Sequence, residues 1–365
     1  MRPALAFLDA AAYNCPCTAL GCLGAGWPGW QSAGIESLKM AVRLRDIAEK
    51  AGVSITTASH VLNGYTKSGI KEETRERVRR IARDMGYRPN AIARSLKNQR
   101  TNTIGFYTGY GFRDARDPFM GEIYTGIQHG CDEMGLDFLI HGNAIKKAAE
   151  EIGLSLNDGR IDGLVVHAAT DDPVVSYLAG STLPAIAIAD PHPTIPSIVA
   201  DDVSGIALLV DYLWAKGHRN IVYFTSNYKI TSIELRANAF RVIMIERGGT
   251  WSIEQFPWTD PDVFVTDFMQ RKNRPTAAVC WHDNSAYYLI SACLEIGVKV
   301  PDDLAIVGFD GLLETRLPAR RLVTVQVPWE KMAHETVRRL VAQVDGERGP
   351  QLVKFPVSLT VGDTA

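Results

Sequence analysis

The sequence has little of what marks enzymes, metalloproteins and disulfide-stabilised proteins. Its six cysteines are few for 365 residues and imply no disulfide framework, which suits a reducing cytoplasm. Its eight histidines show no H-x-x-x-H or HExxH spacing, so no metal site is predicted. A GxSxG motif and a Walker sequence are also missing. We therefore expect no catalytic group and no cofactor.

Charge is unevenly distributed along a chain whose net charge is only −2. Residues 40–100 hold 14 lysines and arginines against 6 acidic residues, whereas residues 101–365 are acidic overall. The hydrophobic content of 46% supports a large buried core and a soluble globular protein of two or three domains. The basic segment indicates a nucleic-acid partner, although a run of charge is more often a solvated surface.

The basic segment contains three stretches with helical periodicity. Apolar residues recur at helical spacing over residues 44–51, and Gly52 is expected to end this helix. After a three-residue turn, Ser54 can cap a second helix over residues 55–62. A third helix is expected over residues 72–85. This is the pattern of a helix-turn-helix, whose second helix reads the major groove of DNA.

Three segments carry a resemblance to a known family. Residues 45–54, 57–64 and 87–97 resemble, in order and spacing, the headpiece and hinge of the LacI/GalR family of bacterial transcription regulators. The run over residues 56–60 is most similar to headpieces of the purine-repressor type. The resemblance extends to about residue 360, and it implies a two-lobed body similar to periplasmic sugar-binding proteins.

The resemblance also implies a DNA-binding surface. Ile55, Thr56 and His60 would read bases in the major groove, and Leu96 is the hinge leucine that wedges into a base step from the minor groove. An ordinary linker is the alternative interpretation of the hinge. The predicted set is Ser54, Ile55, Thr56, Thr57, Ser59, His60, Asn63, Arg94, Leu96 and Lys97.

After the hinge, short apolar runs alternate with helical patterns. This βαβ rhythm predicts parallel sheets covered on both faces. The predicted fold is thus a small all-α headpiece followed by an α/β body with two lobes. Strands are expected over residues 104–107, 138–141, 163–167, 185–189, 221–225, 277–281, 305–309 and 323–327, and helices over 121–134, 204–216 and 284–296.

A ligand is expected between the lobes, where parallel strands end. Arg236 and Asp283 match the effector-contacting arginine and strand-end aspartate of the family, and together they suit vicinal hydroxyls or a carboxylate. The alternatives are a surface ion pair for Arg236, a helix N-cap for Asp283, a turn role for Asp190, and packing for the aromatic residues. The predicted set is Tyr107, Phe119, Asp190, Arg236, Trp258 and Asp283.

Two departures from the family pattern concern the ends of the chain's headpiece helices. Arg43 and Lys71 stand where relatives commonly place Thr or Ser as helix caps. Each substitution removes a side-chain acceptor, with an expected cost of roughly 1 kcal/mol. Neither position lies on the DNA-reading helix, so DNA binding is still expected.

The chain divides into four predicted parts: residues 1–39, 40–86 (headpiece), 87–100 (hinge) and 101–365 (effector-binding and dimerisation body). Residues 1–39 match nothing in the family and precede Met40, so we expect them to be disordered or not translated naturally. A signal peptide is the alternative, because residues 4–8 are apolar, but Asp9 and Asn14 interrupt this run.

The predicted function is that of a ligand-responsive, cytoplasmic transcription regulator, most simply a repressor. Its expected partners are double-stranded operator DNA of pseudo-palindromic sequence, a second copy of the chain, and a small-molecule effector, a sugar or related metabolite. No membrane partner is expected. A sugar-binding transport protein without a DNA role is the main alternative, and an enzyme built on the same body is a more distant one.

Overall fold

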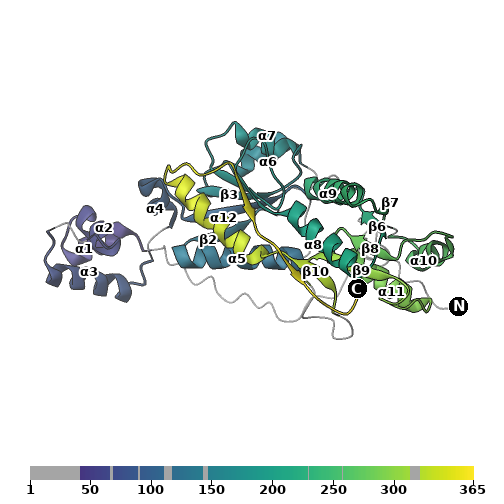
Figure 1. Cartoon of the computed structure of the whole chain (residues 1–365). Helices are drawn as coiled ribbons and strands as arrows, with labels where there is room; N and C mark the ends of the chain where they lie inside the picture. The colour runs from purple at the N-terminus through teal and green to yellow at the C-terminus, as the bar shows by residue number, and fades with distance from the viewer. Residues whose placement is uncertain are drawn as a thin grey trace, which may run out of the picture. The chain divides into compact units, whose positions relative to one another are not determined.

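The computed structural model describes residues 42–65, 69–88, 91–110, 117–142, 147–228, 230–256, 258–312 and 321–365. The chain separates into two compact units at the boundary between residues 89 and 90. The first unit contains the headpiece, and the second contains the predicted hinge helix and the body (Figure 1). The predicted extension over residues 1–39 lies outside the described residues.

The headpiece consists of α1 (Leu44–Ala51), α2 (Ile55–Leu62) and α3 (Glu72–Asp84). Gly52 ends α1 with a φ of 65°, a left-handed conformation that glycine adopts without strain. These bounds confirm the helix-turn-helix prediction within one residue. The three helices meet in a small core of aliphatic side chains, which comprises Ile47, Ala48, Ala51, Ala58, Val61, Val78 and Ala82.

The two unusual caps behave differently. Neither Arg43 nor Lys71 makes a side-chain cap hydrogen bond, as expected. At α1, however, the Asp46 carboxylate accepts a hydrogen bond from the Arg43 backbone N–H at 2.8 Å. This is one half of a capping box, so the start of α1 keeps part of its stabilisation. Of these two helix starts, the start of α3 has no side-chain cap hydrogen bond of either kind among the described contacts.

The first lobe of the body contains a six-stranded, all-parallel sheet with the order β11-β5-β4-β3-β1-β2. Its strands are β1 (Thr103–Thr108), β2 (Asp137–Ile140), β3 (Gly163–His167), β4 (Ala185–Ile188), β5 (Ser197–Ala200) and β11 (Leu352–Phe355). Its helices are α5 (Pro118–Met134), α6 (Ala149–Leu156), α7 (Pro173–Ala179) and α12 (Trp329–Val344).

The second lobe contains another six-stranded sheet, in the order β12-β10-β9-β8-β6-β7, in which only β12 runs antiparallel to its neighbour. Its strands are β6 (Asn220–Thr225), β7 (Thr250–Gln255), β8 (Ala277–Cys280), β9 (Ala305–Asp310), β10 (Val323–Gln326) and β12 (Ser358–Thr360). Its helices are α8 (Asp202–Ala215), α9 (Thr231–Arg247), α10 (Pro261–Gln270) and α11 (Asp283–Glu295).

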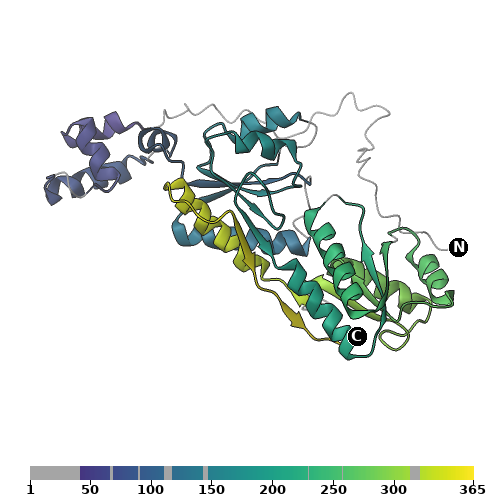
Figure 2. The same cartoon turned by 45° about the horizontal axis from the view of Figure 1, so that its top comes forward.

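Helix α12 returns from the second sheet to the first lobe, where both views show it lying along α5 (Figures 1 and 2). The two helices approach closely because Gly126 and Gly130 of α5 face α12. A Cβ atom on Gly126 would lie 2.2 Å from the carbonyl oxygen of Glu330. The first residue of α12, Trp329, is thereby fixed against the first lobe, at the edge where the strands of that lobe end.

Every strand predicted from the sequence is present, with ends that differ by a few residues at most. Four further strands were not predicted: β5, β7, β11 and β12. Strands β7 and β11 are only partly buried, and β7 alternates apolar with polar residues. Three of the cysteines, Cys131, Cys280 and Cys293, are free and buried, as their apolar surroundings indicate.

Candidate functional site

The start of α2 is held by its own cap. The Thr57 backbone N–H donates to Ser54 Oγ at 3.0 Å, and the two hydroxyl groups lie 2.8 Å apart. At the other end, Asn63 Nδ2 donates to the Ser59 carbonyl oxygen at 2.9 Å. Ser54, Thr57 and Asn63 therefore stabilise the ends of the helix.

The side chains between these caps form the exposed face of α2. Ile55 is 49% exposed and Thr56 is also exposed, whereas Ser59 and His60 are half-buried. The His60 ring lies against the ring of Tyr65, with centroids 5.1 Å apart. Between the two caps, Ile55 and Thr56 are therefore the most exposed residues of the predicted set.

The predicted hinge helix is present as α4 (Ala91–Asn98). Leu96 is 78% exposed, the largest exposed fraction among the large apolar side chains of the described residues, and Arg94 is exposed too. The side chain of Lys97 lies outside the described part of the structure. After the helix, Arg100 donates to the Val344 carbonyl oxygen at 3.2 Å and forms an ion pair with Asp345, at the end of α12.

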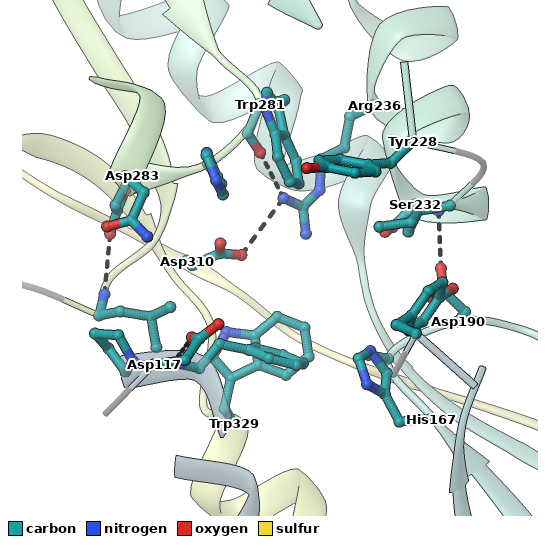
Figure 3. A pocket seen from close by; sticks show the side chains of 18 of the residues that line it. Asp117, His167, Asp190, Tyr228, Ser232, Arg236, Trp281, Asp283, Asp310 and Trp329 are labelled. Atoms are coloured by element: carbon teal, nitrogen blue, oxygen red, sulfur yellow. Dashed lines mark hydrogen bonds and ion pairs between the residues drawn. The ribbon is translucent and has the colours of Figure 1, made fainter. Parts of the chain in front are cut away.

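A cavity of about 500 Å³ lies between the two lobes, at the carboxyl ends of strands from both sheets (Figure 3). This is the position at which open parallel sheets bind small molecules. The wall residues come from the ends of β3, β4 and β9, from the turn between β8 and α11, and from the starts of α5, α9 and α12. The predicted residues among them are Phe119, Asp190, Arg236, Trp258 and Asp283.

Arg236 is the centre of a buried ionic network. Its Nε donates to Asp202 at 2.7 Å, and its Nη1 donates to the Trp281 carbonyl oxygen at 2.7 Å and lies 3.4 Å from Asp310. The guanidinium also lies 3.6 Å from the centre of the Phe309 ring. Burial alone would lower the pKa of Arg236, but Asp202 and Asp310 raise it, so its charge is permanent. The second guanidinium nitrogen, Nη2, makes no hydrogen bond to a described residue.

Asp310 extends into the cavity beside Arg236 (Figure 3). Burial raises the pKa of this carboxyl well above its usual range, while Arg236 acts in the opposite direction. Its backbone has a φ of 114°, and Ala189, another wall residue, has a φ of 75°. Strained non-glycine backbone of this kind gathers at ligand sites, because the surrounding structure must hold it in place.

Polar contacts join the lobes at one side of the cavity. Asp190 follows β4 in the first lobe and accepts hydrogen bonds from Tyr110 at 2.8 Å and from the Ser232 backbone N–H at 3.0 Å. Burial raises the pKa of Asp190, and these two hydrogen bonds lower it. Ser232 belongs to α9, so Asp190 connects the two lobes directly.

Asp283 lines the cavity, but its carboxylate is hydrogen-bonded within the second lobe. Its oxygens accept hydrogen bonds from Thr324 Oγ1 at 2.5 Å and from the Leu312 backbone N–H at 2.9 Å. Burial raises its pKa to about 7. Gly308 makes room for it, since a Cβ atom there would lie 2.4 Å from the carboxylate. Asp283 is therefore a positioning residue for the loop after β9 rather than a free acceptor. The N-cap role falls to His282, which accepts from the Ser285 N–H.

Tyr107 does not line the cavity, so its predicted role as an effector contact is not supported by its position. It is 3% exposed and packs in the core of the first lobe, where its hydroxyl donates to Asp172 at 3.4 Å. Its ring lies on the sheet face covered by α6 and α7, whereas its neighbour Phe106 packs in the other core cluster. The structure therefore favours the alternative interpretation of Tyr107, in which its ring packs in the core of the first lobe.

Several wall residues were missed from the sequence. Asp310 and His167 end strands that were predicted correctly, so the rule that ligands bind at strand ends was sufficient to find them. Trp329 follows the predicted strand over residues 323–327 in the same way. Asp202 does not line the cavity, and it carried no such signal, because its role depends on a contact with Arg236 that is distant in sequence. The other missed wall residues include Tyr110, Tyr228, Ser232, Trp281 and His282.

A helix-turn-helix headpiece and a two-lobed body with a cavity at its strand ends define a DNA-binding regulator with a ligand-binding body. Two family models match this division. Residues 43–90 match the bacterial regulatory proteins of the lacI family, and residues 210–365 match the periplasmic binding protein-like domain.

Relatives along the full body support the same family. The transcriptional regulator DegA of Bacillus subtilis is 30% identical over 341 residues, which cover 88% of this chain and 97% of DegA. The regulator GalR of Escherichia coli is 29% identical over 321 residues, covering 85% of this chain and 91% of GalR. The chain belongs to the lacI family of bacterial transcription regulators.

Solved structures confirm the fold. The Lac repressor dimer bound to operator and the anti-inducer ONPF superposes with a TM-score of 0.77 at 23% identity, covering 89% of this chain and 99% of that one. The regulator CelR in complex with cellobiose gives a TM-score of 0.63, also at 23% identity, and covers 89% of this chain and 100% of that one. Within the described residues, no helix has the length and apolar character needed to cross a bilayer.

Proposed function

We propose that this chain is a dimeric transcriptional repressor whose affinity for operator DNA is set by a small molecule, a sugar or related metabolite, bound between the lobes. It acts in the cytoplasm, and the cavity binds its ligand without a catalytic step. The observation that carries the proposal is the combination, in one chain, of an exposed helix-turn-helix face and a cavity of about 500 Å³ lined by charged, polar and aromatic side chains.

The DNA part of the proposal is supported by exposure and charge. Ile55 and Thr56 are exposed on α2, and the segment over residues 40–100 carries an excess of eight positive charges by sequence. Two copies of the headpiece would bind the two halves of a pseudo-palindromic site. Leu96, exposed on α4, would enter the minor groove at its centre. The names of relatives, among them several PurR repressors, favour repression.

The ligand part is supported by contacts that cross the cavity. The hydrogen bond from Ser232 to Asp190 and the 2.5 Å contact between the Thr170 and Thr231 hydroxyls connect the lobes beside the ligand space. A ligand that changes these contacts would change the angle between the lobes. Arg100, which lies two residues after the end of α4, then donates to the Val344 carbonyl oxygen at the end of α12, so a change at the cavity can alter the hinge. A coupling of about 1–3 kcal/mol is sufficient to switch operator occupancy.

The test is selection of bound DNA. The full chain is mixed with fragments of DNA from its own genome at near-physiological salt, and the retained fragments are sequenced. We expect one pseudo-palindromic sequence to be enriched. Retention of fragments without any common sequence, with affinity that falls steeply as salt rises, would contradict the proposal.

Two variants separate base reading from phosphate binding on the selected site. Thr56→Ala should weaken binding to the selected site by about 1–3 kcal/mol while leaving binding to random DNA unchanged. Arg94→Ala should weaken both about equally. If Thr56→Ala affects both sequences alike, α2 does not read bases.

A further inference from the structure

We propose that the cavity selects an uncharged, polyhydroxylated ligand and excludes anionic relatives of the same compound, such as phosphorylated or carboxylated sugars. This inference deepens the proposed function, on which it rests, by fixing the charge class of the effector. It follows from how the charges around Arg236 are arranged.

Arg236 is the one cation among the described wall residues, and it is already neutralised. Asp202 lies 2.7 Å from its Nε, and Asp310 lies 3.4 Å from its Nη1. All three side chains are at least nine-tenths buried. A ligand anion that approached Arg236 would therefore join two carboxylates around a single positive charge, in surroundings that screen little.

The remaining acidic wall residues add to this exclusion. Asp117 lies at the start of α5 and Asp190 at the end of β4, so the first lobe adds two carboxylates to that of Asp310 in the second lobe (Figure 3). Like charges brought together in a desolvated site cost affinity, and this is how binding sites reject a wrong partner. The carboxylates thus oppose a phosphate or carboxylate group from several directions.

Arg236 and Asp310 together can hydrogen-bond the hydroxyl groups of an uncharged ligand. Arg236 Nη2, which has no partner among the described residues, is a donor beside the acceptor oxygens of Asp310. Neighbouring hydroxyls can accept from the guanidinium and donate to the carboxylate at the same time, without bringing a charge of their own. An uncharged ligand therefore uses both members of the ion pair.

Aromatic rings supply flat apolar surfaces on both walls. On the first-lobe side, the Phe119 and Trp329 rings meet edge to face with centroids 4.9 Å apart. On the second-lobe side, Trp281 stacks on His282 at 3.6 Å, and Trp258 is 42% exposed beside them. The Nε1 groups of Trp281 and Trp329 are buried with no hydrogen-bond partner in the described structure. A ring-shaped ligand with C–H faces and hydroxyl edges fits such a site.

The experiment compares matched ligands on the full chain by titration calorimetry. Each neutral sugar is paired with charged and size-matched forms: glucose with glucose 6-phosphate, glucuronate, glucosamine and 6-O-methylglucose, and likewise for galactose, ribose and cellobiose. We expect at least one neutral sugar to bind at least about tenfold more tightly than its phosphate and its acid. The proposal is overturned if an anionic member or an amino sugar binds best, or if no neutral member binds.

A variant distinguishes charge exclusion from lack of space. Asp310→Asn keeps the size and shape of the side chain and removes its charge, and it leaves a non-glycine residue at this position as before. If charge excludes the anion, the variant should reduce the ratio between neutral and phosphorylated affinities by at least about tenfold. The matched control Asp158→Asn, on the surface of the first lobe where Asp158 pairs with Arg160, should leave that ratio unchanged. An unchanged ratio in Asp310→Asn would overturn the electrostatic account.

Failure of this inference can be separated from failure of the proposed function. A chain that selects a DNA sequence, and releases or binds it in response to a sugar phosphate, is a ligand-controlled regulator with a different ligand class. If the chain binds neutral sugars but selects no DNA sequence, the inference about the ligand stands and the proposal of a repressor fails.

Discussion

The headpiece and the cavity place their functional side chains in opposite environments. Ile55 on α2 is 49% exposed and makes little contribution to its own domain, whereas Arg236 is 3% exposed and joins three elements of the second lobe. Function and stability can therefore be separated in the headpiece but not in the cavity. If the proposed roles hold, a residue that reads DNA can be changed without unfolding the chain, while a residue that binds ligand also supports the fold.

Removing Arg236 should have the largest effect. Arg236→Ala leaves Asp202 and Asp310 buried without their cation, and breaking a buried ion pair in this way typically costs about 3–5 kcal/mol. We expect the free energy of unfolding of the body, measured by chemical denaturation, to fall by that amount, and the ligand response to be lost.

The matched control is Arg247→Ala, which removes a partly exposed partner of Asp211 at the end of the same helix. Exposed pairs contribute about 0–1 kcal/mol, so this variant should remain nearly as stable as the original chain. Equal losses in the two variants would show that Arg236 has no special structural role.

Leu96→Ala tests the other side of the comparison. Because Leu96 is 78% exposed, its loss should leave the unfolding free energy unchanged, but it should weaken binding to the selected operator by about 2 kcal/mol, or roughly thirtyfold. Fluorescence anisotropy with labelled DNA measures the effect. Leu154→Ala, which removes another exposed leucine, is the control. Unaltered operator binding by Leu96→Ala would exclude the wedge.

The pH dependence of stability tests the buried carboxyl of Asp283. Burial raises its pKa from 3.8 to about 7, so between these values the folded state holds a proton that the unfolded chain has released. This contribution to stability is complete below about pH 4 and is lost as pH rises through 7.

Asp283→Asn removes this titration and places an amide nitrogen opposite a donor, at a cost of about 1–3 kcal/mol. The advantage of the original chain over the variant should therefore shrink between pH 4 and 7, as measured by denaturation across that range. An advantage that stays constant with pH would mean that Asp283 is ionised in the folded protein.

Arg100→Ala should have the smallest effect on stability, below about 1 kcal/mol, because its ion pair with Asp345 is partly exposed. Its expected effect is on coupling, since it joins the segment after α4 to α12, whose first residue lines the cavity. The ratio of operator affinities with and without ligand should decrease. A variant that keeps the full ratio would show that the signal passes elsewhere.

The difference between the two regions also explains what could be predicted from the sequence. The headpiece helices follow from local spacing, a cap at Ser54 and a glycine at position 52, all within about twenty residues. The cavity is assembled from strand ends far apart in the chain. Arg236, at the centre of the cavity, was predicted because it matches a family position. Its pairing with Asp202 and Asp310 could not be predicted from local sequence patterns, because these residues meet Arg236 only through the packing of distant segments.

The errors have the same origin. Tyr107 lies on a correctly predicted strand, but the sequence does not say that its ring packs under α6 and α7 in the core of the first lobe. Strands β11 and β12 come from the end of the chain and pair with strands from distant segments, so hydrophobic alternation alone could not place them. Predictions from the sequence were accurate where contacts are local and incomplete where they are not.

The most direct test of the account is the affinity of the full chain for its selected operator, measured with and without a saturating concentration of the neutral sugar that the cavity binds. If the cavity controls the headpiece, the dissociation constant should change by about 5–150-fold, and Arg236→Ala should abolish that change. An operator affinity that stays the same when the cavity is filled would contradict the account, because binding of ligand and binding of DNA would then be independent.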